Sequence, residues 1–427
     1  MEERENRREA AAALRVCYVG YVVQAAAVNL MPLLFGVFQQ QFGLSYAMLS
    51  ALVFVSFGVQ ILTDFLAVCF SKQLESRRTV VVAHSCCALG LILLGVLPMQ
   101  MDQPFWGMVA AACVYSTGCG LIGVTVGALT DALPHPSGKA VLSLLHSFYC
   151  WGQVAVIALS TLLLRVFGEE NWFVLPILWS MLPLWNMICF SKVRLQGVDL
   201  QESSGPASSL LRARPFLLIL VLMVCAGASE TAMSQWSSLF AEEGLGLPKV
   251  LGDLFGPCLF AACMGAGRVW HGLFSAKIAL RRTLMAGAVL SGACYMLTAL
   301  SPWPWLSLLA CALCGVGAGL LWPGVLNLAC VRFPGAGTAL FGMLEICGDV
   351  GSAVGPAAAG VISEAAGKAG LPGLSAGLWA AAAFPLMMLP LLILWQKAQK
   401  PRLYKKAIDE KPPCGYNSSR YREELDR

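Results

Sequence analysis

Apolar residues in this chain occur in long runs that short polar segments interrupt. Each run has roughly 20 to 25 residues, the length that an α-helix needs to cross a hydrocarbon core of about 30 Å. Backbone groups in lipid need hydrogen-bond partners within their own segment, and the alternating pattern of a membrane β-barrel does not occur. We therefore predict an all-α membrane protein with twelve transmembrane helices. The predicted spans are 15–38, 47–70, 79–98, 105–130, 139–163, 172–190, 215–239, 250–274, 281–301, 305–330, 336–361 and 374–396.

The twelve spans divide into two sets of six. The longest polar stretch between spans, residues 191–214, is rich in Ser, Gly and charge, and we predict a cytosolic linker there. It separates an N-terminal six-helix half, 15–190, from a C-terminal six-helix half, 215–397. Residues 1–14 are predicted to be a cytosolic N-terminal segment. The polar tail, 398–427, has mixed charge and is predicted to be cytosolic and disordered.

The two halves look like repeats of each other. An offset of 199 residues aligns spans 4 and 5 with spans 10 and 11, and an offset of 204 aligns the loop after span 2 with the loop after span 8. Two pseudo-symmetric halves of this kind are the layout of a rocker-type secondary transporter, whose binding site lies between the halves. The aligned identities include Gly118/Gly317, Gly120/Gly319, Gly152/Gly351, Arg77/Arg281 and Arg78/Arg282.

Composition and charge placement agree with this topology. Hydrophobic residues make up 58% of the chain and charged residues 12%, about half of the charged share in soluble domains, which excludes a soluble protein. With the amino terminus inside, 25 of the 29 Lys and Arg residues fall on the inner side, while Arg165, Lys249 and Lys368 fall outside and Arg268 lies within a span. This bias predicts cytosolic termini in a multi-pass protein of the cell membrane. The net charge of +5 therefore reflects topology and not a nucleic-acid partner.

Motifs for nucleotide or metal chemistry do not occur. There is no GxxxxGK phosphate-binding loop and no HExxH motif, so neither ATP drive nor a metalloenzyme is indicated. Cys311 and Cys314 have a CxxC spacing, but they lie in an apolar span without a second pair or a nearby His. Cysteines in such spans pack as small hydrophobes. We expect no enzymatic activity, no cofactor and no metal.

The loop after span 2 carries a family signature in altered form. It reads FSKQLESRRT at 70–79. The twelve-span pattern with Arg77 and Arg78 in this loop resembles the major facilitator superfamily. Lys72 and Glu75 stand where the superfamily signature usually has Asp and Gly. The resemblance implies transport by alternating access between the two halves.

Two further segments suggest a group within that superfamily. The segment GASETAMSQW at 227–236, in span 7, is similar to an element of fucose-permease-like sugar and proton symporters. The segment LLHSFYCWGQ at 144–153 resembles uncharacterised bacterial members near that group. The symporter pattern also has acidic residues in spans 1 and 4. Span 1 of this chain has Asn29 instead, so the resemblance does not imply proton transfer through acidic residues of spans 1 and 4.

Ionisable and polar residues inside spans are candidates for the transport site, because a charge at a helix centre costs about 2.5 to 3.5 kcal/mol. Glu230 lies in span 7, and Ser234 shares its helix face one turn later. Gln235 and Trp236 point to other faces of the helix. We therefore expect one of the two side chains to line the cavity and the other to pack against neighbouring helices. Glu230 is open to two interpretations, a substrate or proton site or a buried structural acid.

Span 11 carries two carboxylic acids, Glu345 and Asp349, four residues apart and hence on one face. Two nearby carboxylates in a low dielectric cannot both ionise cheaply, so one is a candidate carrier of a coupled proton unless Arg268 neutralises the pair. The offset of 199 aligns His146 in span 5 with Glu345 in span 11. Proton handling, cavity lining and packing are all open for this histidine. Tyr149 and Gln153 continue its polar stripe.

Two opposite charges, Asp64 in span 2 and Arg268 in span 8, are aligned by the offset of 204. Both lie near the inner ends of their spans. One hypothesis is that they form ion pairs across the interface between the halves and close a cytoplasmic gate. The alternative for Arg268 is a static ion pair, because GAGR at 265–268 is also a close-packing glycine element.

These observations predict a monomeric secondary active transporter for a small polar solute such as a sugar or a related metabolite, working by alternating access and driven by proton symport. Proton-coupled efflux of a drug-like or cationic compound is the alternative within the same class, since Glu230 also suits a cation. A transporter-like solute sensor is the alternative from another class. The expected partners are a small-molecule substrate, protons and the lipid bilayer.

Overall fold

The computed structural model describes residues 2–70, 76–133, 140–193, 210–274, 279–333 and 337–398. These residues are helical without any β-strand, and twelve helical segments are long and apolar enough to cross a membrane. All twelve predicted spans overlap these segments, so the predicted all-α fold is confirmed. Most of the predicted linker and nearly all of the predicted tail lie outside the described residues.

In its described residues, the N-terminal half contains nine elements. These are α1 (Glu2–Leu33), α2 (Phe35–Phe42), α3 (Tyr46–Cys69), α4 (Ser76–Gln100), α5 (Pro104–Ala132), α6 (Ala140–Phe167), the short 3-10 helix η2 (Glu169–Asn171), α7 (Val174–Trp179) and α8 (Met181–Lys192).

The C-terminal half repeats this order of spans. Its elements are α10 (Arg214–Leu239), the π-helical turn η3 (Phe240–Gly244), α11 (Lys249–Asp253), the π-helical turn η4 (Leu254–Cys258), α12 (Leu259–Phe274), α13 (Leu280–Leu300), α14 (Pro304–Arg332), α15 (Gly337–Lys368), α16 (Gly373–Ala381) and α17 (Ala383–Ala398).

Helix boundaries differ from the apolar pattern mainly at the start of the chain. Helix α1 begins at Glu2, although the first apolar run was predicted to begin at residue 15. Residues 10–13 are all alanine, the strongest helix former, so the helix extends beyond the apolar run. The eighth span bends at Gly256, whose backbone is non-helical and is followed by Pro257.

The predicted repeat appears in how the helices pack. Gly152 of α6 lies against Val22 of α1, where an added Cβ would come within 2.9 Å of the Val22 Cα. Gly351 of α15, its counterpart at the offset of 199, lies in the same way against Val224 of α10. Small residues allow helix backbones to approach closely in membranes. The equivalent glycines therefore make equivalent contacts in the two halves.

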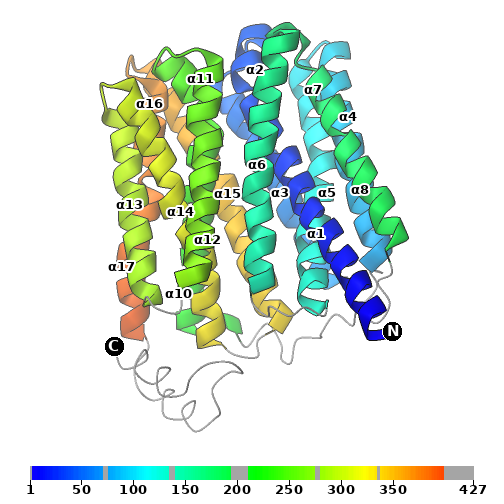
Figure 1. Ribbon diagram of the computed structural model, residues 1–427. Helices are drawn as coiled ribbons and strands as arrows, with labels where there is room; N and C mark the ends of the chain where they lie inside the picture. The colour runs from blue at the N-terminus through cyan, green and yellow to red at the C-terminus, as the bar shows by residue number, and fades with distance from the viewer. Residues whose placement is uncertain are drawn as a thin grey trace.

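Helix α1 begins and α17 ends at the same end of the bundle, which we call the termini side (Figure 1). Helices α2, α7, α11 and α16 lie at the other end, which we call the opposite side (Figure 1). At the interface between the halves, α3 packs against α15 and α6 packs against α12. These four helices therefore form much of the interface between the halves.

Candidate functional site

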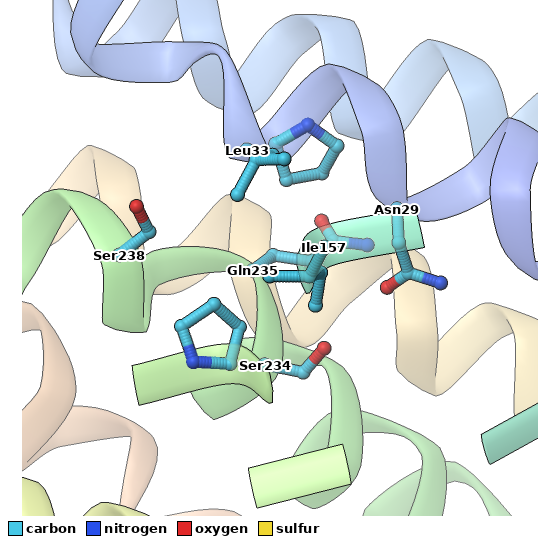
Figure 2. Close-up of a pocket in the computed structure, with 8 residues that line it drawn as sticks. Asn29, Leu33, Ile157, Ser234, Gln235 and Ser238 are labelled. Carbon is cyan, nitrogen blue, oxygen red and sulfur yellow. The ribbon is translucent and has the colours of Figure 1, made fainter. Parts of the chain in front are cut away.

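A small pocket lies between the two halves. Its cavity volume is about 10 Å³, far less than the roughly 300 to 1,000 Å³ of ordinary small-molecule pockets. Figure 2 shows polar side chains of both halves around it, Asn29 from α1 and Ser234 and Gln235 from α10. The complete lining is Asn29, Pro32, Leu33, Ile157, Ser234, Gln235, Ser238 and Pro257.

Amide and hydroxyl groups form the polar part of this pocket and its surroundings. Gln153 Nε2 donates to Ser234 Oγ at 2.9 Å and thereby joins α6 of one half to α10 of the other. Asn29 Nδ2 donates to the Tyr149 hydroxyl at 3.2 Å. The Gln235 side-chain oxygen is buried and accepts no hydrogen bond. A buried acceptor without a donor costs free energy, so this oxygen is available to a donor on a bound solute.

Trp236, the neighbour of Gln235, is a packing residue. Its side chain is buried, its Nε1 donates to the Pro356 carbonyl at 2.9 Å, and its ring contacts Phe35 and Tyr46. Because adjacent residues on a helix point to different faces, Gln235 lines the pocket while Trp236 fixes α10 against its surroundings.

Glu230 and Arg268 form a buried ion pair with an N–O distance of 2.7 Å. Both residues belong to the C-terminal half, so the ion pair across the halves that was hypothesised for Arg268 does not occur in this structure. The guanidinium reaches the other half through neutral acceptors, the His146 carbonyl and the Cys150 thiol, each at 3.3 Å. The ring of His146 packs edge-on against Tyr21.

The second residue of the hypothesised gate, Asp64, faces another acid. Gln60, one turn before Asp64 on α3, donates through Nε2 to Asp349 Oδ2 at 2.9 Å, while Asp64 Oδ1 is buried without a hydrogen-bond partner. In the described residues Asp64 forms no ion pair with a basic side chain, so the hypothesised gate pair stays a prediction. Helix α3 runs beside α15 across the interface, and this register brings the two aspartates together. Glu345 lies one turn from Asp349 and is half-buried.

At the opposite side, a buried lysine connects the two halves. Lys249 Nζ donates to the Leu33 carbonyl at 2.8 Å and forms ion pairs with Glu242 and Asp253 at 3.0 and 3.2 Å. Thr161 of the other half donates to Asp253 at 2.9 Å. From the sequence, Lys249 was assigned only to the outer side of the membrane and not to a contact. Its spacing of four from Asp253, at the edge of an apolar run, was the available signal.

Two further contacts join the halves at this side. The Tyr46 hydroxyl donates to Glu243, and the Ala47 amide donates to Glu364 Oε2 at 2.7 Å. In the described part of the chain, no group of three His, Cys, Asp or Glu residues is placed to hold a metal ion. The chemistry of the site is therefore that of hydrogen bonds and carboxyl groups held between two helical halves.

Comparison with known proteins extends this description. No curated protein sequence matches the chain. Among solved structures, the E. coli fucose:proton symporter is similar with 16% identity and a TM-score of 0.64, over 91% of this chain and 98% of that one. The nucleoside transporter NupG is similar with 12% identity and a TM-score of 0.72, over 91% and 100% of the two chains.

A bacterial homologue of the human lysosomal transporter Spinster is similar with 12% identity and a TM-score of 0.72, over 94% of this chain and 98% of that one. At these identities the structural likeness shows the fold. Residues 17–270 and 258–416 match the sequence model of the Major Facilitator Superfamily, which together is most of the chain. The protein therefore belongs to the Major Facilitator Superfamily and is a multi-pass membrane transporter.

Proposed function

We propose that this transporter moves a small, uncharged, hydroxyl-bearing solute, such as a sugar or a related metabolite, together with protons. The termini side faces the cytosol in this proposal, as the distribution of Lys and Arg predicts, and the membrane is the plasma membrane. The halves alternate between openings to the two sides, and the central pocket closes around the solute between them.

One observation carries the proton-coupling part of the proposal. Three carboxyl groups, those of Asp64, Glu345 and Asp349, lie together at the interface, and none of them forms an ion pair with a basic side chain in the described residues. An ionised carboxylate away from water is strongly disfavoured without a cation beside it. Protons must therefore neutralise part of this cluster, and they can leave when it meets water.

The pocket supports an uncharged solute. Its polar groups are amides and hydroxyls, and Gln235 offers an acceptor without a donor. Glu230 is the acidic side chain that best suited a cationic compound in the sequence, but Arg268 already neutralises it. Among similar structures, one is described as a fucose:proton symporter and another as a nucleoside transporter, which supports a hydroxylated solute.

A thermal-shift screen of the purified protein tests the solute class. The panel contains neutral monosaccharides including L-fucose, nucleosides, organic acids and cationic dyes. A ligand that binds the folded state at a hundred times its Kd stabilises it by about 2.7 kcal/mol. We expect a neutral hydroxylated compound to raise the Tm, and to be exchanged by proteoliposomes that contain the protein. Stabilisation by cationic dyes alone would contradict the proposal and favour efflux.

A further inference from the structure

We propose that Asp64 and Asp349 share one proton across the interface between the halves, and that this pair is the coupling site of the transporter. The inference rests on the proposed proton coupling and assigns that coupling to a pair of residues. From the sequence, Asp64 was only hypothesised to form a gate ion pair, so the proposed role in proton binding comes from its surroundings in the structure.

The first reason is the proximity of two buried carboxyl groups. Gln60 lies one turn before Asp64 on α3 and donates to Asp349 Oδ2 at 2.9 Å, so Asp349 lies beside the part of α3 that carries Asp64. Two neighbouring carboxylates in a low dielectric cannot both ionise cheaply, and a proton on one lets it donate a hydrogen bond to the other. Asp349 already accepts from Gln60, whereas Asp64 Oδ1 is buried without a hydrogen-bond partner, which makes Asp64 the better place for the proton. Both side chains are buried, with 4% and 7% of their surface exposed.

The surroundings of the pair are the second reason. The titratable groups that face it are Tyr21 from α1, Cys119 from α5 and Glu345 from α15. None of these is basic. The buried cation Arg268 is hydrogen-bonded to Glu230 and to two neutral acceptors. The pair therefore depends on a proton for its neutrality.

The position of the pair is the third reason. Asp64 lies on α3 and Asp349 on α15, so the contact exists only while these two helices of different halves stay together. When they separate, each carboxyl group can be hydrated and the proton can pass to water, which leaves two carboxylates. When they approach again, two like charges would be forced together unless one proton is taken up. Protonation is thus tied to the movement of the halves.

Glu345 gives the pair a route to water. It lies one turn from Asp349, toward the termini side, and is half-buried while the pair is buried. Gly120 of α5 supports the other flank, because an added Cβ there would lie 2.6 Å from Asp64 Oδ1. The glycine leaves room for the Asp64 carboxyl group to turn toward Asp349.

Infrared spectroscopy of the purified protein tests the pair without a solute. A protonated carboxyl group has its own C=O absorption, which can be followed as the pH is raised. If one proton is shared, Asp64→Asn and Asp349→Asn should each remove the same band, and the double variant should remove no more. Glu170→Gln, which changes an exposed acid at the opposite side, should leave the band unchanged.

The conservative variant Asp349→Glu keeps an acid at this position and should shift the band while retaining it, which covers the case in which an asparagine variant does not fold. Persistence of the band in either folded asparagine variant, or its loss in Glu345→Gln, would overturn the shared pair. A protein with the shared band but without pH-driven solute accumulation would contradict the proposed function instead. Accumulation without the shared band would contradict this assignment.

Discussion

Lys249 donates to the Leu33 carbonyl at 2.8 Å, from the C-terminal half to the N-terminal half. The same ammonium group forms ion pairs with Glu242 and Asp253. A buried lysine in this arrangement satisfies two carboxylates and a carbonyl that separation of the halves would expose. The contact therefore holds the two halves together at the opposite side.

Removal of this ammonium group should open that side. Lys249→Met removes the hydrogen bond to the Leu33 carbonyl and leaves Glu242 and Asp253 as carboxylates without their cation. Hydration of these carboxylates then favours separation of the halves. Cys258, a buried cysteine whose thiol contacts the Val154 carbonyl of the other half, reports the opening. Membrane-impermeant maleimide should label it several-fold faster in the variant, as measured by peptide mass spectrometry.

Lys368→Met is the matched control for that experiment. Lys368 also pairs with an acid four residues away, Glu364, but its side chain is 75% exposed. Labelling of Cys258 should stay at the wild-type rate in this variant. Equal rates in the wild type and Lys249→Met would show that Lys249 does not hold this side closed.

The ion pair of Glu230 and Arg268 should behave as one unit. Arg268→Met leaves a buried carboxylate without its partner, which costs about 3 to 5 kcal/mol of stability. The double variant Glu230→Gln, Arg268→Met should recover much of this loss, because no buried charge remains. Thermal unfolding of the four proteins of the cycle measures the coupling. Additive effects of the two changes would mean that the pair does not interact.

Gln235 should matter for solute binding and not for stability. Its buried oxygen has no hydrogen-bond donor, so Gln235→Met removes an unsatisfied group and should keep or raise the Tm. The same change should weaken binding of a stabilising solute by about tenfold, or about 1.4 kcal/mol. Titration calorimetry with the solute from the screen measures this. Unchanged affinity would place the solute elsewhere.

Close packing of the repeat predicts a strict size limit at Gly351. An added Cβ would overlap the Val224 carbonyl of α10, so Gly351→Ala should cost about 1 to 3 kcal/mol. Gly367 of the same helix has no atom near the position of such a Cβ and is the control. The two alanine variants are compared by the yield and Tm of the purified protein. Equal Tm values would contradict the packing of α15 against α10.

The spans could be predicted from the sequence because membrane crossing is a local property of length and apolarity. The repeat could be predicted as well, since Gly152 and Gly351 are aligned by one offset and make equivalent contacts. The start of α1 was missed because the helix begins before the apolar run and passes through the alanines that precede it. Apolar residues indicate which part of a helix lies in the membrane, but they do not indicate where the helix begins.

The partners of the buried charges could not be predicted, because they depend on the register between helices that are far apart in sequence. The alignment of Asp64 with Arg268 is correct as a repeat position, yet each meets another partner, Asp349 and Glu230. The choice between Gln235 and Trp236 also needed the structure. Helical periodicity shows that two adjacent side chains point to different faces of the helix, but not which of them faces the pocket.

The central claim is that carboxyl groups between the halves couple proton movement to solute movement. Accumulation of the solute from the screen in proteoliposomes with an imposed pH gradient tests it most directly. We expect the wild type to accumulate solute, and Asp64→Asn, Asp349→Asn and Glu345→Gln to exchange it at equal pH without accumulation, since exchange needs no net release of protons. If these variants, together with Glu230→Gln and His146→Gln, accumulated solute like the wild type, proton coupling through these residues would be wrong.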